Sequence, residues 1–185
     1  MAYSSGFNPH PRISYAGAAP TGAASEAEYV EIALAQVVDA AEIHRLLDEA
    51  LPPGLDVMEV VESPGGSLGD RLEASRWQLD LGETGRLPEA VAAFLAAQEV
   101  LVERMTKKGR RSFDARSAVL ELGFDDEGRV VALVRHSEPM VRPDDVASAL
   151  VTVGDLTLVG TPVFTRLEQG RLDEATGTIT DPLGP

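Results

Sequence analysis

The order in which hydrophobic periodicities change along residues 71–168 constrains the fold of this chain more than any other sequence feature. Alternating apolar and polar residues predict a half-buried strand, as at Trp77, Leu79 and Leu81, whereas apolar residues three or four positions apart predict a helix. On this basis we expect a strand at 77–81, a helix at 88–102, strands at 117–124 and 129–134, a helix from 143 and a strand at 163–167. The order strand, helix, strand, strand, helix, strand is that of a ferredoxin-like split βαβ unit.

Residues 1–62 predict an incomplete copy of the same unit, without its opening strand and helix. The elements expected here are strands at 13–16 and 28–34, a helix after the capping residue Asp39, and a strand at 55–61. Ser, Pro and Gly at 63–70 predict a linker, and the polar residues 169–185 predict a disordered tail. We therefore expect an α+β protein of two ferredoxin-like (βαββαβ) units, at 1–62 and 71–168, with the first incomplete at its start.

Composition excludes several classes of function. The 185 residues include no cysteine, which rules out thiol catalysis, disulfides and cysteine-ligated metal centres. The three histidines, His10, His44 and His136, stand at no metal-ligand spacing, so we expect neither a metal nor another cofactor. No apolar run is long enough to span a bilayer and no signal peptide is visible, which predicts a cytoplasmic protein without membrane contact.

Charge is distributed unevenly along the chain. Sixteen Lys and Arg residues against thirty Asp and Glu residues give a net charge of −14, yet residues 104–116 hold six cations and a single acid, Asp114. The candidate contact residues in this segment are Arg104, Lys107, Lys108, Arg110, Arg111, Phe113 and Arg116. Clustered cations beside an aromatic ring are typical of single-stranded RNA contact. A solvated charged face or an acidic partner protein explains the same pattern.

A second candidate binding element is the loop that ends at Arg12. Its prolines, Pro9 and Pro11, fix the backbone, and a stiff loop of this kind can present side chains to a ligand. The side chains concerned are Phe7, Asn8, His10 and Arg12. Ordinary turn chemistry also explains the composition. The chain has no GxSxG, Walker or GxGxxG motif that would point to a catalytic residue.

The segment from Tyr3 to Tyr15, together with Gly22 and the stretch from Ser25 to Tyr29, resembles the radical-SAM-associated domain of unknown function found in bacteria. Residues 104–109 and 113–116 are similar to a second stretch of that family. The resemblance implies a companion or C-terminal domain of a cobalamin-binding radical SAM protein, and therefore a radical SAM partner. In that family a strand and a helix precede the first motif, and this sequence begins after them.

Three functions remain open at this point. The leading hypothesis is a non-catalytic accessory module that acts with a radical SAM enzyme in RNA modification or RNA binding, through the loop and the basic segment. The second is a metal-independent RNA-processing enzyme that uses His10 as general acid or base. The third is a structural dimerisation domain, because a unit without its opening strand leaves a sheet edge unpaired and such edges pair with other chains.

Overall fold

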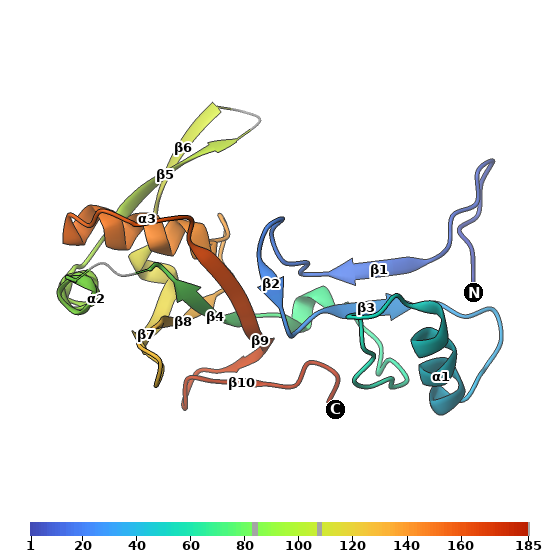
Figure 1. Ribbon diagram of the computed structural model, residues 1–185. Coiled ribbons are helices and arrows are strands. Elements are labelled where there is room, and N and C mark those ends of the chain that lie inside the picture. Colours follow the sequence, from blue (N-terminus) through green and yellow to red (C-terminus); the bar gives the residue numbers. More distant parts are fainter. Residues whose placement is uncertain (83–84, 107–108, 185) are drawn as a thin grey trace.

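A central sheet organises the computed structural model, which describes residues 1–82, 85–106 and 109–184 (Figure 1). Its strands lie in the order β10-β9-β4-β8-β7, all antiparallel, and the two-residue strand β2 pairs with β9 in parallel. Their bounds are β2 Ala24–Ser25, β4 Ala74–Asp80, β7 Val119–Phe124, β8 Val130–Arg135, β9 Val163–Asp173 and β10 Thr178–Thr180. Together with three helices, this sheet confirms the expected α+β class.

Two helices, α2 (Leu87–Ala96) and α3 (Pro143–Gly154), pack side by side and supply the core with the sheet. Phe94 from α2 and Leu150 from α3 are fully buried in one cluster with Leu79 of β4. Each such side chain stabilises the fold by about 1.5–3 kcal/mol relative to an exposed one. No helix of the described residues is both long and apolar enough to cross a membrane.

The element order predicted for residues 71–168 is present, with one insertion. It reads β4, α2, β7, β8, α3, β9, and the last strand pairs with the first, as in a split βαβ unit. Between α2 and β7 lies an additional hairpin of β5 (Leu101–Thr106) and β6 (Gly109–Asp114). The assignment to the ferredoxin-like class stays a prediction.

The predicted helix at 88–102 is wrong at its end, because α2 stops at Ala96 and the chain turns into β5. Val102 continues a helical stripe from Phe94, but together with Val100 it also fits the alternation of a strand. Val100 and Val102 are both buried in the core, which favours the extended conformation of β-branched residues.

Residues 1–62 form an arm beside the sheet, shown in blue to cyan in Figure 1. β1 (Ile13–Ala16) and β3 (Tyr29–Ile32) pair antiparallel, and Asp39 caps α1 (Ala40–Ala50) by accepting a hydrogen bond from Ala41 N at 2.9 Å. These elements agree with the predicted ones. The strand predicted at 55–61 is not formed. Val57 N donates to the Asp48 side chain at 3.2 Å, so this segment follows α1 instead of joining a strand ladder.

One buried arginine ties the arm to the sheet. Arg166 of β9 is only 3% exposed and forms an ion pair with Glu28, just before β3. Its Nη1 donates to Gly17 O at 2.5 Å, and its Nε donates to Ser25 Oγ at 3.1 Å. The Arg166 guanidinium also lies 5.4 Å from the centre of the Trp77 ring. The arm is therefore held in place by polar contacts around a single charge, together with a small apolar cluster of Ala16, Leu68 and Leu72.

Two further contacts complete this junction. Tyr15 donates its hydroxyl to Glu28 Oε2 at 2.7 Å, and Gln169 Nε2 donates to Ala27 O at 2.6 Å. Burial by itself would raise the pKa of Glu28, but hydrogen bonds with Ser25, Tyr15 and Arg166 hold that pKa below its usual value. Glu28 is therefore ionised at neutral pH and matches the buried guanidinium.

The tail predicted to be disordered belongs to the sheet. β9 continues to Asp173, and β10 folds back on it. Arg71 Nη1 donates to Pro182 O at 2.9 Å, which fixes the chain beyond β10. Sequence periodicity did not predict β10, because β10 pairs only with one end of β9 and buries few apolar side chains.

Gly170→Ala tests whether this tail is part of the folded core. An added Cβ would lie against the carbonyl oxygen of Thr180, well inside contact distance, so β10 would have to move. We expect a loss of about 2–3 kcal/mol in the free energy of unfolding, measured in urea. Gly123→Ala on β7 is the matched control, because no atom lies within 4 Å of its added Cβ. Equal stability of the two variants would contradict an ordered tail.

Glu28→Gln tests the junction. Removing the carboxylate charge leaves the buried Arg166 without its counter-ion, and we expect a loss of about 2 kcal/mol in urea unfolding and faster proteolysis within the arm. Glu26→Gln is the control, since Glu26 is exposed and its side chain forms no ion pair among the described residues. If Glu26→Gln costs as much as Glu28→Gln, the effect is one of overall charge and the junction is not what holds the arm.

Candidate functional site

The basic segment predicted to contact anions forms most of the β5–β6 hairpin, which projects away from the sheet (Figure 1). Lys107 and Lys108 lie outside the described residues. Arg110 and Arg111 are exposed on β6. The described part of the hairpin therefore presents two neighbouring arginines to solvent.

Arg110 and Arg111 lie on opposite faces of the hairpin, because successive side chains of a strand alternate. Arg110 Nη1 donates to Glu103 Oε2 at 3.1 Å, an exposed pair that is worth little in water. Arg111 stands opposite Arg104 in the register, and no acceptor binds its guanidinium within the described part of the chain. Among the described cations of this segment, Arg111 is consequently the one most open to a phosphate or a carboxylate.

Arg104 and Phe113 belong to the base of the hairpin and point into the protein. Arg104 Nη1 donates to Asp145 Oδ2 at 2.6 Å and to Met140 O at 3.2 Å. The guanidinium lies 4.9 Å from the centre of the Phe113 ring, which is buried. Asp145 also accepts from Arg142 N at 2.8 Å. These contacts fix the hairpin to the start of α3, and they leave Phe113 unavailable for stacking on a base.

Arg116 is also committed to internal contacts. Its Nη1 donates to Val119 O at 2.9 Å, and its guanidinium lies 5.6 Å from the centre of the Phe94 ring. Arg116 therefore braces the short turn before β7. Of the cations that the sequence groups together, the described ones divide into two with internal contacts, Arg104 and Arg116, and two that are exposed, Arg110 and Arg111.

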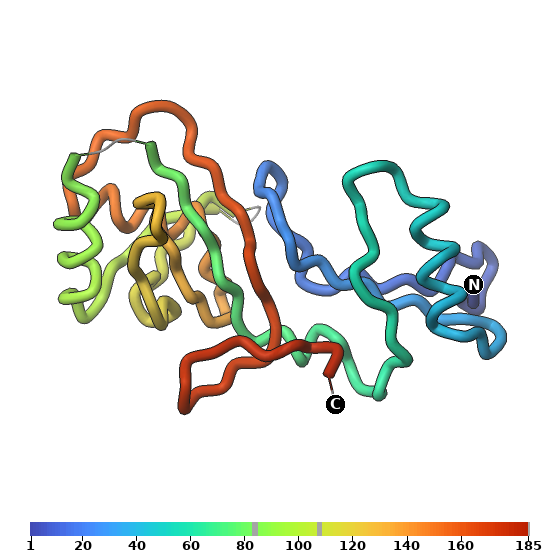
Figure 2. The backbone as a smooth tube through the Cα atoms, turned by 60° about the horizontal axis from the view of Figure 1, so that its bottom comes forward, coloured from blue at the N-terminus to red at the C-terminus, as the bar shows by residue number. Residues whose placement is uncertain are grey.

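The proline-rich loop forms a closed turn in the arm. Ser4 N donates to His10 O at 2.8 Å, and His10 N donates to Ser4 Oγ at 3.0 Å. Phe7 is fully exposed within this turn, and Asn8, His10 and Arg12 are exposed as well. The loop and the hairpin lie in separate parts of the molecule in Figures 1 and 2, so the two sets of predicted site residues do not meet.

A serine–histidine pair lies between β4 and the end of β8, at residues that belong to no recognisable sequence motif. His136 Nδ1 is 2.6 Å from Leu72 O, and its Nε2 is 2.7 Å from Ser75 Oγ. A carbonyl only accepts, so Nδ1 carries the proton and Nε2 accepts from the Ser75 hydroxyl. A nucleophile and its base are arranged in this way. Ser75 is only 1% exposed, however, so the pair joins two strands and is closed to a substrate.

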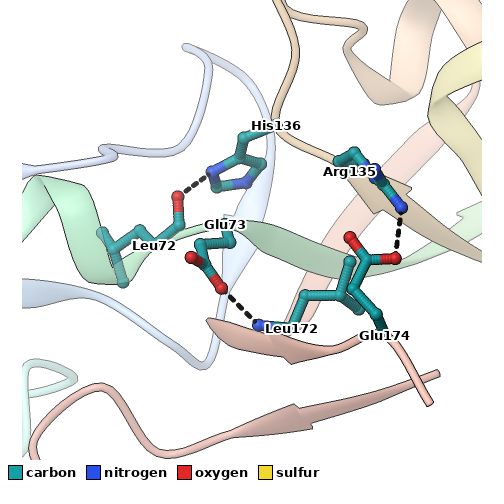
Figure 3. Close-up of a pocket in the computed structure, with 6 residues that line it drawn as sticks. All are labelled: Leu72, Glu73, Arg135, His136, Leu172 and Glu174. Atoms are coloured by element: carbon teal, nitrogen blue, oxygen red, sulfur yellow. Dashed lines mark hydrogen bonds and ion pairs between the residues drawn. The ribbon is translucent and has the colours of Figure 1, made fainter. Parts of the chain in front are cut away.

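An open pocket of about 360 Å³ lies beside His136 (Figure 3). It is lined by Leu72, Glu73, Arg135, His136, Leu172 and Glu174. Its charged groups are already engaged: Arg135 Nη2 donates to Glu174 Oε2 at 2.6 Å, and Glu73 Oε2 accepts from Leu172 N at 2.9 Å. These contacts hold the extended end of β9 against β4 and β8.

Neither the hairpin nor this pocket contains a metal-binding cluster. Over residues 1–82, 85–106 and 109–184, no three His, Asp or Glu side chains are placed to hold one ion. The arrangement of the described residues is suited to contact through exposed, projecting elements.

Comparison with known proteins gives a family. The family model DUF2344, described as an uncharacterized protein conserved in bacteria, matches residues 1–143. The chain belongs to the DUF2344 family. The match includes the arm, the hairpin and the first residue of α3. No curated protein and no solved structure matches the chain.

Family membership confirms the expectation of a bacterial domain of unknown function. In this DUF2344 protein, the motif residues Tyr15, Ser25 and Glu28 surround the buried Arg166. Their spacing gave a recognisable pattern, but sequence reasoning missed their partner, because Arg166 lies 138 positions after Glu28.

His136 predicts a pH dependence of stability. Burial lowers the pKa of His136, although its hydrogen bond with Leu72 opposes that shift. The unfolded chain therefore takes up a proton near pH 6.5 that the folded chain does not bind, and stability falls as the pH drops below that value, by at most about 1.4 kcal/mol per pH unit. Urea unfolding of the wild type and of His136→Gln between pH 7.5 and 5.5 measures the pH-dependent contribution of His136 to the free energy of unfolding. The same pH dependence in both proteins would contradict it.

Proposed function

We propose that this DUF2344 protein is a non-catalytic accessory module that contacts RNA through the β5–β6 hairpin and acts with a radical SAM enzyme. The observation that carries the RNA contact is the exposed pair Arg110 and Arg111 on a projecting hairpin in a chain of net charge −14. Phosphates supply most of the free energy of such contacts, and arginine binds them well. The radical SAM partner rests on the resemblance of the motifs described above.

The base of the hairpin supports this proposal. The Arg104–Asp145 ion pair holds β5 against α3, and both partners are largely buried. An anchored base reduces the conformational entropy that binding must remove from the hairpin. The exposed cations can then meet a phosphate chain from either face, which suits a flexible single strand better than a rigid duplex.

Charge reversal on the hairpin tests the RNA contact. Fluorescence anisotropy with a labelled 12-nucleotide single-stranded RNA of mixed sequence, at 50 and 200 mM salt, gives the affinity and its salt dependence. For Arg110→Glu with Arg111→Glu we expect at least a tenfold loss of affinity at 50 mM salt. The slope of log K against log salt should shrink by about 1.4, since each lost phosphate contact contributes about 0.7.

The control is Arg86→Glu, compared with Arg111→Glu alone. Both change an exposed arginine by the same charge, but Arg86 lies at the start of α2 and not on the hairpin. If Arg86→Glu weakens RNA binding as much as Arg111→Glu, only the net charge matters and the hairpin is not the contact surface. Absence of binding by the wild type at 50 mM salt also overturns the RNA contact.

The same samples separate the other hypotheses. RNA cleavage by the pure protein in chelator, abolished by His10→Ala, would show the RNA-processing enzyme instead. Affinity purification from a bacterial lysate, with and without ribonuclease, tests the partner. Recovery of a radical SAM protein that resists ribonuclease supports a direct protein contact, and its absence from both samples contradicts the radical SAM part of the proposal.

A further inference from the structure

The apolar side chains of the arm are almost all exposed or only half-buried. Among residues 1–67, all of which the structure describes, Ala16 alone is buried. Helix α1 is amphipathic, with Ile43, Leu46 and Leu47 on one stripe, yet it has no buried residue. An amphipathic helix normally buries its apolar stripe against another element. Within the described chain the stripe of α1 is only partly covered: Ile43 and Leu47 are half-buried and Leu46 is 44% exposed.

Several of the exposed apolar residues of the arm lie on α1 or in the segments that flank it. The segment after the helix turns back along it, as the hydrogen bond from Val57 N to Asp48 Oδ1 requires and as Figure 2 shows. Met58, the next residue, is 86% exposed. We call the following five exposed residues the α1 face: Val37, Leu46, Leu51, Leu55 and Met58.

Charge indicates what would cover the α1 face. Residues 1–62 contain two arginines against ten acidic residues, a net charge of −8 within a chain of −14. Arg45, the single arginine of α1, already pairs with Glu42 and Glu49. The acids close to Met58 in sequence are exposed and form no ion pair among the described residues; they are Asp56, Glu59 and Glu62.

A second copy of the arm would bring eight further negative charges against these acids, which disfavours self-association through this face. A cationic occupant is favoured instead. We propose that the α1 face is the docking surface for a basic amphipathic helix of a partner protein, with leucine-like residues on the apolar stripe and Lys or Arg around it. This inference rests on the proposed function, because it names the chemistry of the protein partner of the accessory module.

Three synthetic 18-residue peptides test the α1 face at 150 mM salt. The first is an amphipathic helix with Leu at positions i, i+3, i+4 and i+7 and Lys elsewhere; the second replaces each Lys by Glu; the third scrambles the first so that no apolar stripe exists. The expected result is binding of the first peptide at least tenfold tighter than of either other peptide. Amide chemical-shift changes in NMR spectra should be confined to residues 34–62.

Substitutions then locate the contact. The double variant Leu46→Ser with Met58→Ser should lower the affinity for the first peptide at least tenfold. The double variant Asp56→Lys with Glu59→Lys should lower it by a similar factor. Val159→Ser is the control, since Val159 is 71% exposed, between Leu46 at 44% and Met58 at 86%, but lies outside the arm. Equal binding of the first and scrambled peptides, or shift changes outside the arm, would overturn the proposal. A stable dimer in light scattering that Leu46→Ser with Met58→Ser dissolves would show a second copy as the occupant and would also overturn it.

The hairpin variant Arg110→Glu with Arg111→Glu distinguishes this inference from the RNA contact. It should bind the amphipathic peptide like the wild type, while it loses RNA. If the hairpin contact fails in the RNA assay but the peptide still binds the arm, the docking surface stands without the RNA function. If the peptide does not bind the arm but RNA binds the hairpin, the docking surface is overturned and the RNA contact stands.

Discussion

The buried guanidinium of Arg166 is the interaction on which the arrangement of this molecule depends. A charge of this kind costs several kcal/mol to remove from water unless its donors are matched. Here Glu28 supplies the opposite charge, and Gly17 O, Ser25 Oγ and Gln169 Oε1 accept from the remaining donors. Most of these acceptors belong to the arm, so the arm and the end of the sheet can satisfy Arg166 only together. The strand β2, which pairs with β9 at Arg166, is a consequence of the same contact.

This junction explains how an arm with almost no core of its own stays in one place. The apolar side chains of the arm contribute little burial, and the polar network does the positioning instead. The outer surface of the arm is thereby free to remain apolar and acidic. The β5–β6 hairpin has a comparable design, since the Arg104–Asp145 pair anchors its base and leaves Arg111 open. Both projecting elements combine anchoring contacts to the rest of the fold with an exposed outer part.

Local sequence patterns gave most of the secondary structure and less of the candidate sites. Apart from the β5–β6 hairpin and β10, the order of strands and helices after residue 70 followed from periodicity, because each of these elements buries one face in the same core. Val100 and Val102 fit two periodicities, and their burial decided for the strand. Phe113 fits an RNA-stacking pattern among cations, but the hairpin turns it inward. Ser112, the residue before it, is exposed on the other face, a difference that depends on which face of the hairpin meets α3.

The sequence by itself determined the α+β class, the capped helix at Asp39, the family motifs and the concentration of cations in one segment. Each of these features depends on the spacing of residues along the chain or on local backbone preferences. Both are set by residues that are close together in the sequence. Tertiary structure alone decided the contacts between residues far apart in the chain. Glu28 forms an ion pair with Arg166, Ser75 forms a hydrogen bond with His136, and β10 of the polar tail pairs with β9. Each of these contacts is made by groups whose identity is common, and only the folded sheet brings the right pair within hydrogen-bonding distance.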